Sequence, residues 1–328
     1  MRAIGFRANG GPEVLEAVEV ARPEPGPGQV LLRVAYAGVN FAEIQHRRGE
    51  FGADDGVAVP GLEAAGEIVA VGADVTGLRI GEPVAAYLPA FGGYAEFVVA
   101  EAVLTHPLRT TQGEVDPAQA AGLPCVFPTA YGLLHDTARL RAGETVLIHA
   151  AAGGIGATAV QLARSLGAAA VHGTVGSPDK VAYARELGYD EVFVRDGFGA
   201  AMLAATGGRG VDVVLDPVGG PVRQESLGVL APFGRVAVYG DVGRHDDWTA
   251  SVWDLWKRNQ TIAGFNIGDL ARRAPELIGR YLREGLERVA AGTLRSNVTV
   301  IHPLAEAATV HELVESGAGR GKILLSLT

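Results

Sequence analysis

One stretch, residues 145–175, constrains the fold of this chain more than any other. A short apolar run at 146–148 predicts a buried strand, and a turn of small residues follows it. Residues 157–167 then carry apolar side chains at helical spacing, and the apolar run at 168–175 predicts a second strand. Strand, tight turn, helix and strand form one βαβ unit. The first turn of such a unit is where a dinucleotide pyrophosphate binds.

The turn between this strand and helix consists of residues with almost no side chain. Backbone N–H groups at a helix start must approach phosphate oxygens closely, which excludes bulky side chains there. Gly153 and Gly156 fill the second and third glycine positions of a G-x-G-x-x-G pattern, and Ala151 stands at the first. Glycine supplies 46 of the 328 residues, about twice its usual share, so a Gly-rich structural turn is the alternative. The context favours cofactor binding by Ala152, Gly153, Gly154, Ile155 and Gly156.

The end of the second strand favours NADPH over NADH. An NAD-binding chain carries a carboxylate for the ribose about twenty residues past the turn, and none stands there in this sequence. A small, neutral strand end at Gly173, followed by Ser177 and Lys180, suits a 2′-phosphate, which needs room, hydroxyl donors and positive charge. Arg195, after the next predicted strand, is placed to add a planar cation over the adenine. The alternative for Lys180 is a solvated residue on the next helix.

The composition restricts the partners and the compartment of the chain. The net charge of −9 argues against nucleic-acid and anionic-membrane partners, because both need a basic face. Cys125 is the single cysteine, which rules out an intramolecular disulfide and fits a cytoplasmic, reducing compartment. Residues 1–20 lack the basic and apolar regions of a signal peptide, and the longest apolar stretch is too interrupted to cross a membrane. We therefore expect a small-molecule partner.

The order of predicted elements indicates two domains. Short strands between Gly- and Pro-rich turns predict a partly open β-barrel in the first third, with strands at 3–6, 30–35, 63–71, 82–87 and 93–99. From Asp116, an N-cap followed by proline, helices begin and then alternate with strands through residue 239, which predicts a doubly wound parallel sheet. Helices at 270–291 and 305–316 and a strand at 322–327 return to the first domain. The predicted division is a barrel-like domain of residues 1–121 and 266–328 around a dinucleotide-binding domain of residues 122–265.

A set of short motifs runs along the chain at residues 38–44 with Arg47 and Gly49, 60–66, 128–131, 150–156, 173–176 and 321–323. Together they resemble the zinc-independent quinone oxidoreductases of the medium-chain dehydrogenase/reductase superfamily, over nearly the whole chain. The resemblance implies an α/β architecture with a GroES-like catalytic domain around a Rossmann domain, an NADPH cofactor, and a homodimer formed through the Rossmann sheet. Further cofactor contacts are expected from Gly240, Val242, Phe265, Asn266 and Lys322.

The resemblance also implies that no metal is bound. Zinc-binding relatives place a Cys where Asn40 stands and a His where Leu62 stands, and they carry a four-Cys lobe that a single cysteine cannot build. A carbonyl must then be polarised by hydrogen-bond donors, and the Asn40 amide is the catalytic candidate. The alternative is that Asn40 is a turn residue bonded to its own backbone.

The sequence departs from the relatives at two positions near the expected substrate. Glu43 stands where many relatives carry Asp, and Phe51 stands near a position where many carry a substrate-facing Tyr. Phe51 can stack but cannot donate a proton, so a tyrosine acid would have to be Tyr87, Tyr94 or Tyr131. Tyr131 is the catalytic candidate, with a place in the helix core as its alternative.

The substrate pocket is expected to be lined by Phe51, Glu63 and Trp248. Trp248, Trp253 and Trp256 either wall a hydrophobic pocket or form one amphipathic packing face. Their spacing fits both alternatives, and we prefer the packing face. Cys125, among apolar neighbours, is expected to be inert packing.

These expectations combine into a leading hypothesis of NADPH-dependent hydride transfer to a quinone, without a metal. The nicotinamide supplies the chemistry, and the protein supplies position, a dry site and a donor for developing negative charge. A quinone needs no strong general acid, whereas the α-carbon of an enone must receive a proton, so the shortage of candidate acids favours a quinone. The alternatives are reduction of an enone or enoyl-thioester double bond and, in a different class, an NADPH-binding structural protein with little turnover.

Overall fold

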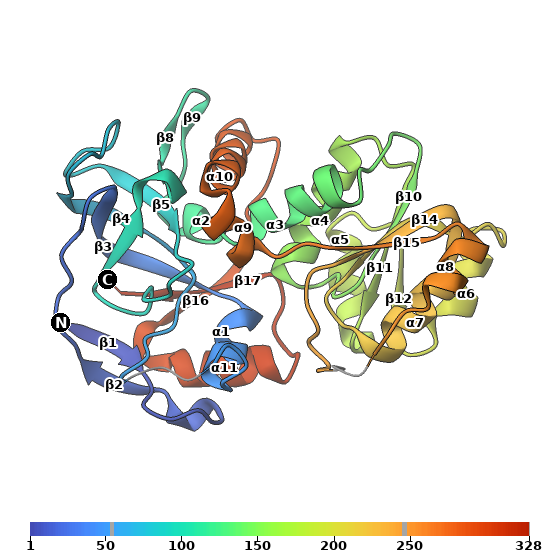
Figure 1. The fold of residues 1–328 in the computed structure, drawn as a ribbon, viewed down its shortest axis with the longest axis horizontal. Helices are drawn as coiled ribbons and strands as arrows, with labels where there is room; N and C mark the ends of the chain where they lie inside the picture. Colours follow the sequence, from blue (N-terminus) through green and yellow to red (C-terminus); the bar gives the residue numbers. More distant parts are fainter. Residues whose placement is uncertain (53–55, 245–247, 328) are drawn as a thin grey trace. The chain divides into compact units, whose positions relative to one another are not determined.

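The computed structural model describes residues 1–52, 56–244 and 248–327. The chain divides into two compact units (Figure 1), unit 1 of Met1–Pro128 with Ile267–Thr328 and unit 2 of Thr129–Asn266. The sequence had placed these boundaries after residues 121 and 265. None of the helices in the described part of the chain is both long and apolar enough to cross a membrane.

Unit 2 is built on a six-stranded parallel sheet with the strand order β12-β11-β10-β13-β14-β15. The strands are β10 (Thr145–Ile148), β11 (Ala170–Val175), β12 (Glu191–Val194), β13 (Val211–Asp216), β14 (Leu230–Val238) and β15 (Thr261–Gly264). The chain runs outward from β10 to β12 on one side and from β13 to β15 on the other. The strand order therefore reverses between β10 and β13, and ligands bind at the carboxyl ends of the strands at such a point. This confirms the predicted doubly wound sheet.

Helices follow most strands of this sheet, as a parallel sheet requires. Helix α4 packs on β10 and β11, α5 on β11 and β12, α6 on β12, and α7 on β14. The helices that end in or belong to unit 2 are α3 (Val126–Gly132), the π-helix η3 (Leu133–Thr137), α4 (Gly154–Ser165), the 3-10 helix η4 (Pro178–Lys180), α5 (Val181–Glu186), α6 (Phe198–Ala205), α7 (Gly220–Gly228) and α8 (Val252–Arg258). Apolar side chains of β10, β13 and β14 are fully buried in the core beneath them.

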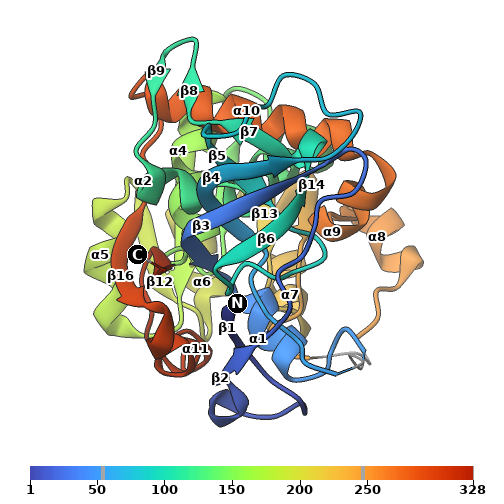
Figure 2. The same ribbon diagram turned by 90° about the vertical axis from the view of Figure 1, so that its left-hand side faces the viewer.

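Unit 1 contains a seven-stranded sheet with the order β16-β17-β3-β4-β5-β7, and β6 also pairs with β3 (Figure 2). Its strands are β3 (Gln29–Val39), β4 (Glu63–Val71), β5 (Pro83–Tyr87), β6 (Phe97–Glu101), β7 (Thr105–Pro107), β16 (Val298–Pro303) and β17 (Lys322–Ser326). Strand β17 runs antiparallel to β3, with Ile323 opposite Val39. The closing strand therefore completes the first unit, as the sequence predicted.

Two small hairpins and several helices complete unit 1. The hairpins are β1 (Arg2–Gly5) with β2 (Glu16–Glu19), and β8 (Arg109–Thr110) with β9 (Gly113–Glu114). Helix α11 lies beside α1, and α10 lies beside β8 and β9 (Figures 1 and 2). The helices are η1 (Pro12–Val14), α1 (Phe41–Arg47), η2 (Ala102–Leu104), α2 (Pro117–Ala121), α9 (Ile267–Arg273), α10 (Pro275–Ala290), η5 (Leu304–Glu306) and α11 (Ala307–Glu315).

The structure corrects three details of the sequence-based prediction. The single helix expected at 270–291 is two helices, because Pro275 lacks an N–H and Ala274 before it leaves helical geometry at φ −148°. The strand expected at 93–99 lies later, at Phe97–Glu101. Trp253 and Trp256 do not form an internal packing face, since they are 59% and 66% exposed and stack on each other with ring centroids 4.6 Å apart.

Candidate active site

The predicted phosphate turn opens a twelve-residue helix, α4, and its N-cap is Gly153 in extended geometry. No side chain in the described part of the chain caps this helix. The first hydrogen bond into the helix runs from the Ala157 N–H to the Gly153 oxygen at 2.9 Å. The amides of Gly154, Ile155 and Gly156 precede it and have no partner within the helix. They present the N–H groups and the positive end of the helix dipole that an anion needs.

The glycines of this turn are required by close backbone approach. A Cβ on Gly156 would lie 2.6 Å from the Ala151 oxygen and 2.7 Å from the Ala150 oxygen. A Cβ on Gly173 in β11 would lie 2.6 Å from the Ala151 side chain. A Cβ on Gly153 would meet a single backbone oxygen, Ala150, at 3.3 Å. The turn therefore has the side-chain-free surface that fits a pyrophosphate.

Ser177, Lys180 and Arg195 surround the end of β11. Ser177 is extended at φ −148° and begins η4, and Lys180 ends it with 7% of its surface exposed. The alternative of a solvated Lys180 is therefore wrong. Arg195 follows β12, and a Cβ on Gly176 would lie 3.6 Å from its Nη2. A hydroxyl and a guanidinium thus flank the strand end where the sequence predicted a 2′-phosphate.

His149, directly after β10, forms a buried link that the sequence analysis missed. Ser226 donates its hydroxyl hydrogen to the Val222 oxygen at 2.7 Å, so it must accept from the His149 Nε2–H at 2.8 Å. Thr174 must then donate to His149 Nδ1 at 2.7 Å. Burial lowers the pKa of His149 to about 4, so the ring is neutral at physiological pH. The link fixes the ends of β10 and β11 against α7, directly beside the phosphate turn.

A second buried link joins the ends of β13 and β14. Asp216, with no exposed surface, accepts hydrogen bonds from the N–H of Val218 at 2.7 Å and from Arg223 Nε at 2.7 Å. Arg223 also donates to the Gly240 oxygen at 2.9 Å and lies 5.2 Å from the Trp248 ring centroid. Two predicted site residues, Gly240 and Trp248, are therefore held by one arginine that the sequence analysis did not single out.

The other predicted residues of unit 2 lie near these strand ends. The Val242 N–H donates to the Pro217 oxygen at 2.9 Å, and the Val242 side chain is 39% exposed. The Phe265 N–H donates to the Val238 oxygen at 2.8 Å, its ring packs against Gly132, and the exposed Asn266 follows it. Tyr131 is half-buried and stacks on His135 with centroids 5.0 Å apart, so it is not a core residue.

In unit 1, Asn40 is the N-cap of α1, and its amide is fully engaged. Its Oδ1 accepts a hydrogen bond from Lys322 Nζ at 2.6 Å. Its Nδ2 donates to Glu63 Oε1 at 2.9 Å and to Glu43 Oε1 at 3.2 Å. Both amide hydrogens are thus committed to carboxylates, which differs from the expected role of Asn40 as a free donor to a carbonyl. Its backbone N–H donates to Glu43 Oε2 at 2.8 Å, in the manner of a capping box.

The charged partners of Asn40 are buried with it. Glu63 has no exposed surface, its Oε2 accepts from the Cys125 N–H at 2.7 Å, and its Oε1 forms an ion pair with Lys322. The sequence assigned Glu63 to the substrate pocket and Lys322 to the cofactor, and the structure places both side chains in this cluster. Burial raises the pKa of Glu43 to about 7, although Lys322 and the Leu62 N–H lower it.

The tyrosines of unit 1 are poor candidates for a proton donor. Tyr87 and Tyr94 are 1% and 0% exposed, and burial raises the pKa of each hydroxyl well above its usual value. Phe51, by contrast, is 57% exposed. The Cys125 thiol is buried, and burial raises its pKa, which agrees with the expected inert packing.

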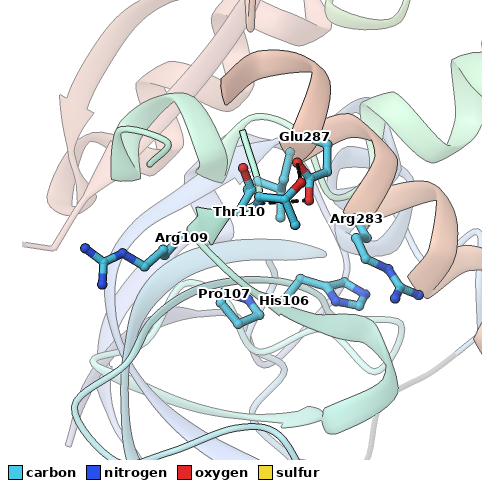
Figure 3. A pocket seen from close by; sticks show the side chains of 8 residues that line it. His106, Pro107, Arg109, Thr110, Arg283 and Glu287 are labelled. Carbon is cyan, nitrogen blue, oxygen red and sulfur yellow. Dashed lines mark hydrogen bonds between the residues drawn. The ribbon is translucent and has the colours of Figure 1, made fainter. Parts of the chain in front are cut away.

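One shallow pocket in unit 1, of about 320 Å³, is lined by none of these residues (Figure 3). Glu287 in this pocket accepts hydrogen bonds from the Thr111 N–H at 3.1 Å and from its hydroxyl at 2.9 Å, while Arg109 is directed away from it. The pocket contains none of the predicted site residues. Its lining consists of His106, Pro107, Arg109, Thr110, Thr111, Arg283, Leu286 and Glu287.

Comparison with known proteins decides the family. Residues 26–110 match the alcohol dehydrogenase GroES-like domain, and residues 154–283 match the zinc-binding dehydrogenase family. A 2-haloacrylate reductase of Burkholderia sp is 36% identical, over 96% of this chain and 96% of its own length. The chain belongs to the medium-chain dehydrogenase/reductase superfamily. The predicted GroES-like and Rossmann domains are those of this superfamily.

Other members of the superfamily are similar over almost the whole chain. A quinone oxidoreductase of Pseudomonas aeruginosa is 32% identical over 99% of both chains. A phthioceranic/hydroxyphthioceranic acid synthase of Mycobacterium bovis is 32% identical over 98% of this chain, which spans 15% of that protein. The crystal structure of Escherichia coli quinone oxidoreductase complexed with NADPH has a TM-score of 0.90 at 28% identity, covering 99% of this chain and 100% of that one. This superfamily member is therefore a quinone oxidoreductase-like, NAD(P)H-dependent reductase.

Proposed function

We propose that this protein is an NADPH-dependent reductase that transfers a hydride to a quinone without a metal. The observation that carries the proposal is the uncapped start of α4, where the amides of residues 154–156 face a turn that side chains cannot enter. The similarity to an Escherichia coli quinone oxidoreductase complexed with NADPH supports it. The single, buried Cys125 is consistent with a cytoplasmic location, which is part of the proposal.

The proposal gives each part of unit 2 a task. The amides of Gly154, Ile155 and Gly156 hold the diphosphate, with Ala152, Gly153 and Gly173 leaving room for it. Ser177, Lys180 and Arg195 hold the 2′-phosphate and the adenine end. The backbone around Gly240, Val242, Phe265 and Asn266 orients the nicotinamide, and Tyr131 and Trp248 of the same unit contribute to the acceptor side. When bound, the nicotinamide supplies the hydride.

A second candidate acceptor is an activated carbon–carbon double bond. The name 2-haloacrylate reductase, borne by a relative of 36% identity, favours it. We expect steady-state NADPH oxidation to be fastest with 1,4-benzoquinone and slower with a 2-enone or crotonyl-CoA. The reverse order would replace the quinone by the double bond as the acceptor. Tight NADPH binding without oxidation by any of the three would instead indicate a binding protein with little turnover.

The preference for NADPH depends on Lys180. We expect Lys180→Ala to raise the KM for NADPH by about tenfold or more, because a hydrogen bond to a charged group contributes roughly 1.5–3 kcal/mol, and to change the KM for NADH by less than about twofold. Initial rates with both cofactors measure this. Lys257→Ala, at an exposed lysine of the same unit, is the control and should change neither KM. Equal effects of Lys180→Ala on both cofactors would contradict a 2′-phosphate contact.

We further propose that the protein is a homodimer paired through unit 2. Strand β15 is an edge of the sheet, and an edge offers unpaired backbone groups to a second copy. Helix α8, which comes just before β15 in the chain, exposes Val252, Trp253 and Trp256, and exposed apolar side chains of this size favour burial against a partner. Sedimentation should give the mass of two chains, and Trp253→Glu with Trp256→Glu should shift it to one. A monomeric wild-type protein at micromolar concentration would contradict this proposal.

A further inference from the structure

The zinc of the zinc-binding relatives does not fit the residues of this chain. Asn40 and Leu62 stand where those relatives place Cys and His, and Leu62 offers its backbone N–H to Glu43 Oε1 at 2.9 Å rather than a ligand. The nearby Cys125 is a neutral thiol, because burial raises its pKa. Among the residues that the structure describes, no three His, Cys, Asp or Glu side chains are grouped to hold a metal ion.

An ammonium group lies against the side chain of Asn40. Lys322 Nζ donates to the Val39 oxygen at 2.9 Å and to Asn40 Oδ1 at 2.6 Å, and it forms an ion pair with Glu63 Oε1. Its side chain is 4% exposed, and that of Glu63 is 0% exposed. A backbone carbonyl, an amide oxygen and a carboxylate are the oxygen ligands that a hard cation takes in proteins. The three N–H groups of the ammonium match the three oxygens one to one.

We propose that the Lys322 ammonium is a built-in cation that takes the place of the catalytic metal of the zinc-binding relatives, and that Lys322 is a positioning residue that acts through Asn40. The expected effect of Lys322 on kcat rests on the proposed reductase function. Lysines are three of the chain's 28 basic residues, so the sequence uses arginine almost everywhere else. A compact point charge suits a site enclosed by three oxygens, whereas the planar fork of arginine does not.

The Lys322 ammonium fixes the orientation of the Asn40 side-chain amide. The Lys322 ammonium lies at Oδ1, and the carboxylates of Glu63 and Glu43 lie at Nδ2. A flipped amide would place its NH₂ group against the ammonium and its oxygen against the carboxylates. The cation at Oδ1 also polarises the amide and strengthens its N–H groups as donors. The longer of the two Nδ2 contacts, 3.2 Å to Glu43 Oε1, is the weaker one and is the N–H that an acceptor oxygen can take over. Lys322 thereby prepares a donor without touching the substrate.

The test is to remove the ammonium and supply it from solution. Lys322→Ala lacks the atoms of n-propylammonium, so this ion should refill the space. In Lys322→Ala we expect kcat to fall by about 100-fold, as when a catalytic group is misplaced by about an ångström. The Kd for NADPH should change by less than about threefold, because Lys322 acts on turnover and not on cofactor binding. n-Propylammonium chloride should restore kcat at least about tenfold in a saturable way, and tetramethylammonium chloride at equal ionic strength should not.

Thermal unfolding without cofactor or acceptor provides a readout that is independent of turnover. n-Propylammonium should raise the Tm of Lys322→Ala saturably but not that of the wild type or of Lys257→Ala, whose lysine is exposed. If Lys322→Ala does not fold alone, it should fold when refolded with the amine. Lys322→Met, which fills the space without charge, should fold with low kcat and no rescue.

Four outcomes would overturn the proposal. The first is a folded Lys322→Ala that the amine does not rescue, and the second is a Lys322→Ala with a large rise in the Kd for NADPH but an unchanged kcat. The third is that neither Lys322→Ala nor Lys322→Met folds in the presence of the amine. The fourth is a rise in the Tm of the wild type when zinc is added. If the wild type reduces none of the acceptors, the proposed function fails, and the unfolding experiment still decides whether Lys322 is the cation of this site.

Discussion

Replacing Arg223 with methionine is expected to lower the melting temperature by about 10 °C, the largest stability loss that we predict for one side chain. The Asp216 carboxylate has no exposed surface. The substitution removes its guanidinium partner, which lies 2.7 Å away. Breaking a buried ion pair in this way costs about 3–5 kcal/mol, because the remaining charge is desolvated and uncompensated. Since Arg223 also donates to the Gly240 oxygen at 2.9 Å, NADPH affinity should fall as well. Differential scanning calorimetry and cofactor titration measure the two effects.

The chain supplies a matched control for this experiment. Arg185 pairs with Glu191 at 3.7 Å in the same unit, but both of these side chains are more than half exposed. Arg185→Met should therefore cost at most about 1 kcal/mol, as exposed pairs do. The double variant Asp216→Asn with Arg223→Met also removes the unpaired carboxylate charge. It should recover at least about half of the free energy of unfolding that Arg223→Met loses. If Arg223→Met and Arg185→Met lower the free energy of unfolding equally little, burial is not what makes the Asp216–Arg223 pair important.

Replacing Gly156 with alanine is expected to weaken NADPH binding by about 10- to 100-fold. The new Cβ would lie 2.6 and 2.7 Å from two backbone oxygens of the turn, neither of which is a flexible side-chain end. The turn must shift to relieve the overlap, at a cost of about 1–3 kcal/mol, and the shift moves the amides that hold the diphosphate. Isothermal titration with NADPH measures the effect.

Two other glycines provide a graded series for comparison. Gly153→Ala meets one backbone oxygen at 3.3 Å and should have a smaller effect. Gly228→Ala at the end of α7 meets no described atom within 4 Å, and it should leave binding unchanged and stabilise the protein slightly. Equal losses of affinity at all three positions would contradict a steric origin in the turn.

The sequence predicted the strand, turn and helix at 145–165 better than the buried polar clusters, for a physical reason. The turn at 150–156 is a local structure, because the strand, glycines and helix that define it are neighbours in the chain. The break before α10 was also readable locally, since Pro275 cannot continue a helix, although a single helix was predicted there. Such features depend on backbone geometry and need no knowledge of tertiary contacts.

The buried polar groups required the three-dimensional structure. Lys322 and Asn40 are 282 residues apart in the chain, and no periodicity links them. Glu63 and Lys322 both lie in short motifs that the sequence analysis used, but whether a charge faces a ligand or another charge depends on the sheet register. In this fold β17 pairs with β3 and β3 with β4, which brings the two together. Similarly, the exposure of Trp253 and Trp256 could not be inferred from their spacing, which fits an internal face equally well.

The pairing of β17 with β3 has a consequence for the order of events during synthesis. Residues 29–39 leave the ribosome almost 300 residues before β17, and proteins are made at about 5–20 residues per second. All strands of unit 2 are complete before β17 is made, so unit 2 has time to fold while the sheet of unit 1 still lacks a strand. A nascent chain that stops before residue 322 therefore contains all strands of unit 2, but its Asn40 lacks the Lys322 ammonium.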